Sequence, residues 1–390
     1  MVTLFFILGL TILESRMTKI TAKNMLLELL EPTEIKVNGN NPWDIQIKND
    51  EFFPRVFKEG VLGLGESYMD GWWECRRLDQ LFEKLIQANL EEQVKTNKKF
   101  LLKSLLLKFI NLQTKERSWH VGEKHYDLGN ELFKNMLDSR MNYTCGYWEK
   151  VTTLEEAQRD KLELVCRKLQ LQPGMKLLDI GCGFGALAKY AAENYDVNVV
   201  GVTISKEQAA LARQRCQGLP VDIVLTDYRD ITGKFDRIAS LGMFEHVGKL
   251  NYRTYMEVVH DSLTDDGLFL LHTIGDNVTT ASANEWTTKY IFPNGVLPSI
   301  SGIGKGCEGL LIMEDWHNFG VDYDKTLLAW YDNFNQNWDK LKHLYDERFY
   351  RMWNYYLLSS AGSFRARYIQ LWQIVFSKSG LKKGYHRPSL

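Results

Sequence analysis

The sequence predicts an α/β protein with a parallel, doubly wound sheet. Between residues 175 and 274, short apolar segments that end in glycine or acidic residues alternate with segments of helical composition. This alternation is typical of consecutive βα units, whose strands run parallel. The composition, 45% apolar and 25% charged, is that of a folded globular protein, and 390 residues are enough for two domains.

The elements of this sheet can be assigned in chain order. Strands are predicted at 175–181, 197–204, 221–227, 235–243 and 267–274, and helices at 184–195, 206–216 and 252–263. A last strand is predicted at 368–377, where it would lie at the edge of the sheet. Before it, apolar residues recur at helical spacing at Leu327, Tyr331, Phe334 and Trp338. Such a stripe usually packs in the core, although the wall of an acyl-chain site has the same pattern.

A glycine-rich turn follows the first strand. Gly181, Gly183 and Gly185 alternate strictly, and Asp179 stands two residues before the first of them. Glycines let a ligand approach the backbone, and the helix that begins here offers free N–H groups. The spacing differs from the dinucleotide pattern G-x-G-x-x-G and is similar to motif I of class I S-adenosylmethionine (SAM) methyltransferases. A tight turn without a ligand is the alternative.

Three polar residues are predicted at the carboxyl ends of neighbouring strands, where open α/β sheets bind ligands. Glu245 and His246 follow the fourth strand, and His272 lies near the end of the fifth. A carboxylate and an imidazole beside the glycine turn can position or accept a proton. The alternative is that Glu245 caps the next element and His272 belongs to the core.

Nine longer motifs, in one order, resemble the cyclopropane fatty acid synthase family of bacteria. They include GLGESYMDGWW, LDIGCG, GMFEHVG and EDWHNFGVDY, and they lie at 63–73, 125–130, 145–148, 178–183, 199–205, 242–248, 269–275, 289–295 and 314–323. The resemblance covers nearly the whole chain from about residue 36. It implies a class I SAM-methyltransferase fold, with a mostly parallel seven-stranded sheet and a smaller N-terminal domain. The implied reaction transfers the methyl carbon of SAM to a cis double bond of a phospholipid acyl chain, leaving a cyclopropane ring.

The resemblance also implies two sets of site residues. Around a bound bicarbonate ion it places Cys145, Glu245, His272, the backbone of Ile274, and Tyr323. Around SAM it places Tyr143, Thr144, Asp179, Gly181, Gly183, Thr203, Gln208, Tyr228 and Gly242. Thr144 stands where the family commonly has serine, and Phe184 where it has tryptophan; both changes keep the chemical character. No metal site is expected.

The residue types suit this chemistry. Methylation of an alkene produces a carbocation, which the aromatic faces of Tyr323, Phe244 and Tyr147 can stabilise. A small anionic base can then remove a proton from the new methyl group. Two adjacent anions repel, so either the bound ion is protonated or Glu245 orients His272. A covalent role for Cys145 is set aside, because this transfer needs no thioester or thioether; a weak S–H hydrogen bond to the anion is expected.

Four segments are expected along the chain. Residues 1–16 are interpreted as an extension from a misassigned start, 17–95 as an N-terminal lipid-associated domain, 96–120 as a basic amphipathic linker, and 121–390 as the catalytic domain with an insertion at about 275–322. The stretch from 95 to 117 carries seven cationic residues against Glu116. It suits an anionic membrane surface, and a solvated linker helix is the equal alternative.

Composition and charge restrict the partners. The net charge of −1 provides no general attraction for nucleic acid, and six scattered cysteines without a C-x-x-C pair indicate a reducing cytosol. The cysteine usage predicts a cytoplasmic protein, and the resemblance implies a homodimer that is peripherally associated with the inner face of the membrane and acts on an unsaturated membrane phospholipid. Two alternatives stay open: a related lipid C-methyltransferase that leaves a methyl or methylene branch, and a lipid-surface binding protein without activity.

Overall fold

The chain forms two compact units in the computed structural model, which describes residues 19–90, 129–280 and 284–390. The larger unit comprises 129–283, 294–341 and 367–390, and the smaller one comprises 1–128, 284–293 and 342–366. Residues 1–16 and the basic stretch 96–120 lie outside the described residues. The expectations for those two segments therefore stay predictions.

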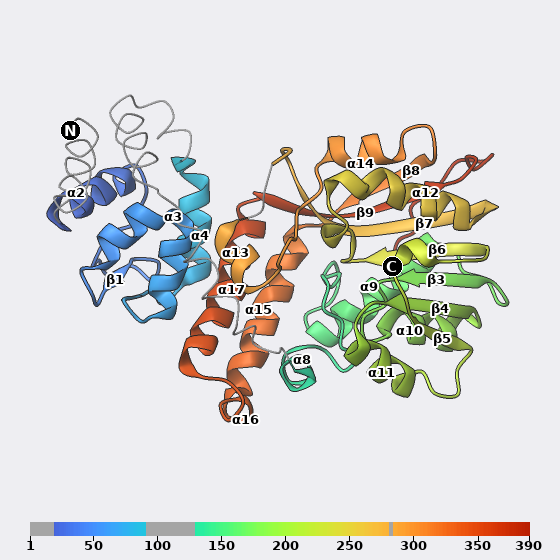
Figure 1. Cartoon of the computed structure of the whole chain (residues 1–390), viewed down its shortest axis with the longest axis horizontal. Coiled ribbons are helices and arrows are strands. Elements are labelled where there is room, and N and C mark those ends of the chain that lie inside the picture. The colour runs from blue at the N-terminus through green and yellow to red at the C-terminus, as the bar shows by residue number, and fades with distance from the viewer. Residues whose placement is uncertain (1–18, 91–128, 281–283) are drawn as a thin grey trace, which may run out of the picture. The chain divides into compact units, whose positions relative to one another are not determined.

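A seven-stranded sheet forms the centre of the larger unit, with helices on both faces (Figure 1). Its spatial order is β5-β4-β3-β6-β7-β9-β8. The strands are β3 (Lys176–Ile180), β4 (Asn198–Thr203), β5 (Val221–Leu225), β6 (Phe235–Leu241), β7 (Leu263–Asp276), β8 (Ile312–Asn318) and β9 (Ile369–Ser377). The first five run parallel, and β9 runs antiparallel to both β7 and β8. The predicted mostly parallel, doubly wound sheet is confirmed.

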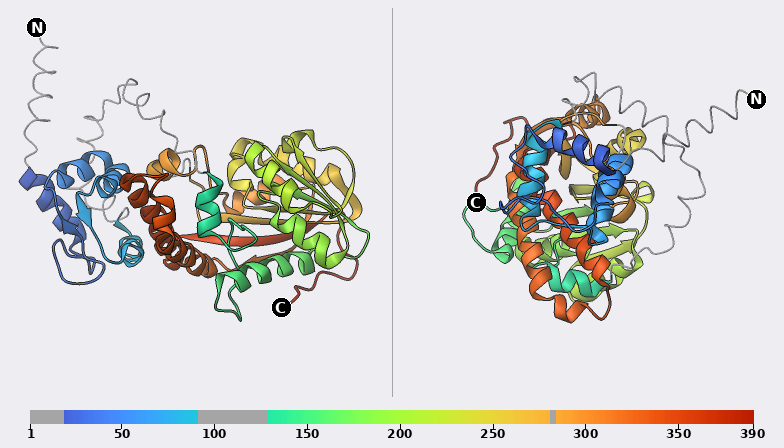
Figure 2. Two further views of the ribbon diagram at one scale, coloured as in Figure 1. Left: turned by 90° about the horizontal axis from the view of Figure 1, so that it is seen from below. Right: turned by 90° about the vertical axis from the view of Figure 1, so that its left-hand side faces the viewer.

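Alternation along the strands supplies a core on each face of the sheet. Leu178 and Ile180 of β3 belong to one hydrophobic cluster, and Leu177 of the same strand belongs to the other. Helices α12 (Tyr252–Ser262) and α14 (Ile300–Cys307) cover the first cluster, while α9 (Leu154–Lys168), α10 (Ala186–Tyr195) and α11 (Lys206–Arg215) cover the second. Figure 2 shows the same layering in two further views.

The predicted position of the last strand was wrong. β9 lies between β7 and β8, and β8 forms the edge. Eight of the nine residues of β9 are buried, as an interior strand requires, whereas none of the seven residues of β8 is. β8 was missed because its polar sequence IMEDWHN lacks the apolar run of a central strand. Polar residues are usual on an edge strand, where they discourage pairing with another chain.

The aromatic segment after β8 forms α15 (Val321–Gln336), which packs on α8 (Asn130–Met136) and precedes the short α16 (Trp338–Leu341). Leu327 and Phe334 are fully buried, which confirms the core interpretation for these two members of the stripe. Three short 3-10 turns, η1 (Tyr228–Asp230), η2 (Phe244–His246) and η3 (Lys249–Asn251), follow the carboxyl ends of β5 and β6.

The smaller unit is mainly helical. It contains α2 (Lys19–Leu30), α3 (Phe52–Met69), α4 (Leu78–Gln87), α13 (Glu285–Tyr290) and α17 (Glu347–Arg365), with a short pair of strands, β1 (Gln46–Ile47) and β2 (Trp73–Glu74). The smaller unit is not the contiguous N-terminal segment that was expected, because it also includes α13 and α17, which lie within the segment 121–390. Two glycines allow these helices to pack closely on α3 and α4. A Cβ on Gly65 of α3 would lie 2.3 Å from the Trp286 indole of α13, and a Cβ on Gly362 of α17 would lie 2.4 Å from the carbonyl oxygen of Asp79 on α4.

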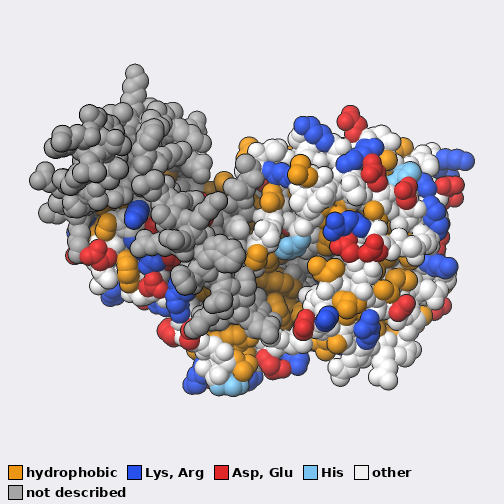
Figure 3. Space-filling model, in the orientation of Figure 1, with side chains coloured by type: hydrophobic (Ala, Val, Ile, Leu, Met, Phe, Trp, Pro, Cys, Tyr) orange, Lys and Arg blue, Asp and Glu red, His pale blue; other side chains and the backbone are white. Residues whose placement is uncertain are grey.

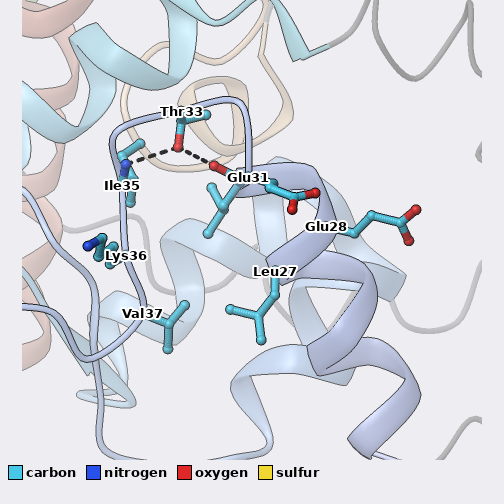
Figure 4. Close-up of a pocket in the computed structure, with 8 residues that line it drawn as sticks. Leu27, Glu28, Glu31, Thr33, Ile35, Lys36 and Val37 are labelled. Atoms are coloured by element: carbon cyan, nitrogen blue, oxygen red, sulfur yellow. Dashed lines mark hydrogen bonds between the residues drawn. The ribbon is translucent and has the colours of Figure 1, made fainter.

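A pocket of about 570 Å³ lies in the smaller unit, between the end of α2 and the loop that follows it (Figure 4). The hydroxyl of Thr33 shapes this loop by donating to the Leu30 carbonyl at 2.7 Å and accepting from the Ile35 N–H at 3.0 Å. None of the expected site residues lines this pocket. Within the described ranges, no helix combines the length and the hydropathy needed to cross a bilayer.

Candidate active site

The glycine turn after β3 has the geometry of a ligand cradle. Gly181, Gly183 and Gly185 all have positive φ, at 79°, 52° and 76°, a region that side chains rarely adopt. A Cβ on Gly181 would lie 2.8 Å from the Met243 side chain, whereas a Cβ on Gly183 would meet nothing within 4 Å. The backbone at Gly183 therefore borders open space, which is the place where a cofactor can approach the turn.

The other residues expected around SAM follow neighbouring strands at the same edge of the sheet. Thr203 ends β4, and its hydroxyl donates to Oε1 of Gln208 in the first turn of α11 at 3.2 Å. Tyr228 begins η1 after β5, and its ring centroid lies 5.1 Å from that of Tyr255. Gly242 follows β6 with φ of 69°. The carboxyl ends of parallel strands meet at one edge, so these residues lie at the same edge of the sheet as the glycine turn.

Thr144 is held beside this crevice by a buried lysine that the sequence analysis missed. A Cβ on Gly242 would lie 2.8 Å from the Thr144 methyl group. The Thr144 hydroxyl accepts from Nζ of Lys161 at 2.8 Å, and Oδ1 of Asn142 accepts from the same ammonium at 2.9 Å. Burial lowers the pKa of Lys161 to about 8 and raises that of Asp179 to about 7. Lys161 thus supports the loop that carries Thr144.

Tyr143 of the same loop packs among aromatic rings. Its centroid lies 5.1 Å from that of Phe133 and 5.2 Å from that of Trp330. Phe184, the aromatic residue after Gly183, lies 5.6 Å from Phe133. An aromatic wall therefore runs from the glycine turn to α8 and α15.

Glu245 is a buried carboxyl with one oxygen fixed and one without a partner. Its Oε1 accepts from the Ile274 N–H at 2.7 Å, while the buried Oε2 has no hydrogen-bond partner among the described residues. Burial raises the pKa of Glu245 to about 7. The backbone of Ile274, which was expected beside the anion, contacts Glu245 through its N–H. His246, its neighbour in sequence, is exposed to solvent.

His272 is a fully buried imidazole on β7. Its Nδ1 lies 3.1 Å from Nε2 of Gln373, and Nε2 of His272 has no partner among the described residues. Burial, with the positive charges of Lys161 and Lys168, lowers the pKa of His272 well below its ordinary value. The imidazole is therefore neutral in the folded protein.

Cys145 contacts α15, the helix that carries Tyr323. Sγ of Cys145 is 3.8 Å from the hydroxyl of Thr326, which lies one turn after Tyr323 on α15. Burial raises the pKa of the Cys145 thiol well above its ordinary value, so the thiol is protonated and a poor nucleophile. The Thr326 hydroxyl also accepts from the Gly146 N–H at 3.1 Å and the Trp148 indole N–H at 2.9 Å, which joins the Cys145 loop to α15.

Phe319 connects the two groups of residues. Its ring centroid lies 6.1 Å from that of His272 and 5.4 Å from that of Tyr147, in the Cys145 loop.

Phe244, which was expected to face a carbocation, is instead fully buried in the hydrophobic core and stacks on Tyr252 at 4.4 Å. Tyr323 is buried and lies 6.0 Å from Trp330, ring to ring.

A parallel sheet whose first strand ends in an acidic, alternating glycine turn, with polar residues along the same edge, defines a class I SAM-dependent methyltransferase. No group of acidic, histidine or cysteine side chains within the described residues could hold a metal ion. Residues 113–374 match the mycolic acid cyclopropane synthetase family, and the chain belongs to this family.

Individual relatives agree with this assignment. The cyclopropane-fatty-acyl-phospholipid synthase of Escherichia coli strain K12 is 56% identical over 357 residues, which cover 92% of this chain and 93% of that protein. The structure of mycolic acid cyclopropane synthase CmaA1 complexed with SAH and CTAB is 34% identical, covers 67% of this chain and 98% of its own, and superposes with a TM-score of 0.61. The cyclopropane synthase MmaA2 from Mycobacterium tuberculosis is 31% identical, with 69% and 100% coverage and a TM-score of 0.62.

Proposed function

We propose that this chain transfers the methyl carbon of SAM to a cis double bond in a phospholipid acyl chain and forms a cyclopropane ring. The observation that carries the proposal is a pair of buried polar atoms, Oε2 of Glu245 and Nε2 of His272, at the same sheet edge as the glycine turn; neither has a hydrogen-bond partner in the part of the chain that the structure describes. The near full-length similarity to the E. coli cyclopropane-fatty-acyl-phospholipid synthase supports this substrate class.

The proposed cofactor site fits SAM. When bound, SAM supplies an electrophilic methyl group whose bond to sulfur breaks as the new bond to an alkene carbon forms. The open space at Gly183 receives the cofactor, and the Thr144 loop and the Thr203–Gln208 pair border it. An alkene is a weak nucleophile, so the chain contributes mainly by alignment and by excluding water with its aromatic wall.

A small anion such as bicarbonate fits the second part of the site. When bound, it accepts a proton from the transferred methyl group, and the released C–H electron pair closes the ring. Glu245 and His272 offer buried polar atoms that lack other partners, and the Cys145 thiol and Tyr323 complete the proposed set. A buried polar group without a partner costs free energy, which favours a ligand at these atoms.

The protonation states support a specific role for Glu245. With a pKa of about 7, this carboxyl is largely protonated at slightly acidic pH, and a neighbouring anion raises that pKa further. Glu245 then donates a hydrogen bond from Oε2 while Ile274 holds Oε1. The hydrogen-bond partner of the His272 side chain is Gln373, which weakens the alternative that Glu245 orients His272.

The proposal extends to the membrane. On the face of the larger unit in Figure 3, cationic and anionic side chains are interspersed. We propose that the basic stretch between 95 and 117 supplies the contact with anionic lipid, on the cytoplasmic face of the membrane. A homodimer is part of the same proposal, and analytical ultracentrifugation tests it.

The deciding experiment uses the full chain, SAM and vesicles of cis-unsaturated phospholipid. The released acyl chains are examined by mass spectrometry before and after mild hydrogenation, and by proton NMR of the ring methylene. We expect one added carbon and a ring signal that is absent without SAM. A methyl- or methylene-branched product would instead identify a related C-methyltransferase, and failure to bind SAM by calorimetry would favour a lipid-binding protein.

A further inference from the structure

A row of polar side chains crosses three neighbouring strands of the sheet, and its members on β7 and β9 are buried. Gln373 on β9 stands directly opposite His272 on β7 and, on its other side, opposite His317 on β8. The three strands lie side by side at one end of the sheet (Figure 1). Gln373 is fully buried, and its neighbours in β9 are apolar. A buried carboxamide is costly unless its hydrogen bonds serve the structure or the site.

The Gln373 contact determines which nitrogen of His272 carries the proton. The amide nitrogen Nε2 of Gln373 lies 3.1 Å from Nδ1 of His272. An amide NH₂ can only donate, so Nδ1 must accept with its lone pair. In a neutral imidazole the proton then resides on Nε2. That Nε2 is the buried atom without a partner among the described residues.

The far end of the row helps to keep His272 neutral. Lys168 on α9 is fully buried, and its Nζ lies 3.0 Å from Nδ1 of His317. When Lys168 is protonated, its charge disfavours a positive charge on His272. A neutral His272 can present either a proton or a lone pair at Nε2, and these have opposite consequences for an anion. The proton attracts it, whereas the lone pair repels it.

We propose that Gln373 is a positioning residue that fixes the Nε2–H tautomer of His272 and so makes His272 a hydrogen-bond donor to the anion. This inference rests on the proposed function in taking the ligand to be an anion. It assigns proton removal to the bound anion and leaves His272 to hold that anion in place. A lone pair at Nε2, by contrast, would make His272 itself the base.

The test is nitrogen NMR of the full chain labelled with ¹⁵N-histidine, with the His272 signals assigned from a His272→Gln variant. In the unmodified protein we expect a pyridine-type Nδ1 and a pyrrole-type Nε2. Gln373→Met removes the donor at similar volume, so the two tautomers should exchange and both shifts move toward the average. At alkaline pH, where the introduced carboxyl is ionised, Gln373→Glu puts an acceptor in the same place and should move the proton to Nδ1, an effect that loss of packing alone does not produce.

Gln370→Met is the matched control. Gln370 lies on the same strand but on the opposite face, and it bonds with Asn318 and Arg367. The spectrum of His272 should be unchanged in this variant. In activity assays, Gln373→Met should raise the bicarbonate concentration for half-maximal rate about tenfold, as for loss of a positioned hydrogen bond.

A pyrrole-type Nδ1 in the unmodified protein, or a His272 spectrum that ignores both Gln373 variants, would overturn the inference. Gln373→Glu retains the size of the side chain, so it serves as the decisive variant if Gln373→Met does not fold. The spectra need no bound anion. Activity that is indifferent to bicarbonate would therefore refute the anion proposal, while the spectra separately decide the role of Gln373.

Discussion

Replacement of Glu245 by glutamine should make the protein more stable at alkaline pH than the unmodified chain. Burial raises the pKa of this carboxyl from 4.5 to about 7. Between these values the folded protein retains the proton while the unfolded chain has released it, so stability falls as pH rises through this window. At 1.36 kcal/mol per pKa unit, the loss amounts to about 3 kcal/mol above pH 7. Glutamine does not titrate and should avoid this loss.

The measurement is chemical unfolding at several pH values from 4.5 to 8. The stability difference between Glu245→Gln and the unmodified chain should be small near pH 4.5 and approach about 3 kcal/mol at pH 8. The control is Glu257→Gln, an exposed position on α12 paired with Arg253. Its stability should follow the unmodified chain at every pH. Equal pH dependence for Glu245→Gln and the unmodified chain would refute the argument that burial keeps Glu245 protonated.

Two variants at Glu245 test its proposed role as a hydrogen-bond donor in catalysis. Glutamine can keep the Ile274 contact through its oxygen and donate from its nitrogen, so cyclopropane formation should fall no more than about tenfold. Its rate should also lose the decline that we expect for the unmodified enzyme above pH 7. Glu245→Ala removes the donor and should lower the rate by about 10²–10³-fold, while SAM affinity stays within about tenfold. Equal, severe losses in both variants would indicate that the charged carboxylate is required.

Three other predictions address the cofactor turn, the buried lysine and the membrane contact. Gly183→Val should abolish SAM binding in calorimetry with the fold retained in circular dichroism, because its side chain enters the open space beside the turn; unchanged affinity contradicts the site. Lys168→Met should stabilise the protein more at pH 7 than at pH 10. Burial lowers the pKa of Lys168 from 10.5 to about 7, so the stability of the unmodified protein falls as the pH decreases from 10.5 to 7, and methionine removes this loss. A stability difference between variant and unmodified chain that does not change with pH contradicts this. Glutamate at Lys98, Lys99, Lys103 and Lys108 should weaken sedimentation with anionic vesicles, at about 1 kcal/mol per lysine; binding that is indifferent to both charge and salt favours the linker interpretation.

The sequence was sufficient for the features that depend on local pattern. The parallel strands and the helices between them follow from apolar runs and glycine punctuation, and their observed ends differ from the predicted ones by a few residues. The largest difference is at β7, which extends over Leu263–Asp276. Asp179 and Gly183 could be placed at a strand end for the same reason. These signals lie within one strand, turn and helix.

Features that depend on pairing between distant segments could not be predicted. The order β7-β9-β8 depends on which strands form hydrogen bonds with each other, and a single sequence does not contain this information. Gln373 offered a signal, since it is a lone amide between tryptophan and isoleucine in an apolar run, but its role depends on the register with His272. Lys161 gave no such signal, because a lysine on a helix is normally exposed.

Burial favours the neutral form of three proposed site residues, and the proposed chemistry requires that form. Low polarity around the site raises the pKa of the Glu245 carboxyl and the Cys145 thiol and lowers that of the His272 imidazole, so all three groups tend to be neutral. A carboxylate or thiolate beside a sulfonium and a developing carbocation would be alkylated, whereas a neutral hydrogen-bond donor is a much weaker nucleophile. Donors can still hold a small anion in place. In the proposed mechanism, the negative charge is thereby reserved for a base that is bound from solution and can be replaced after each turnover.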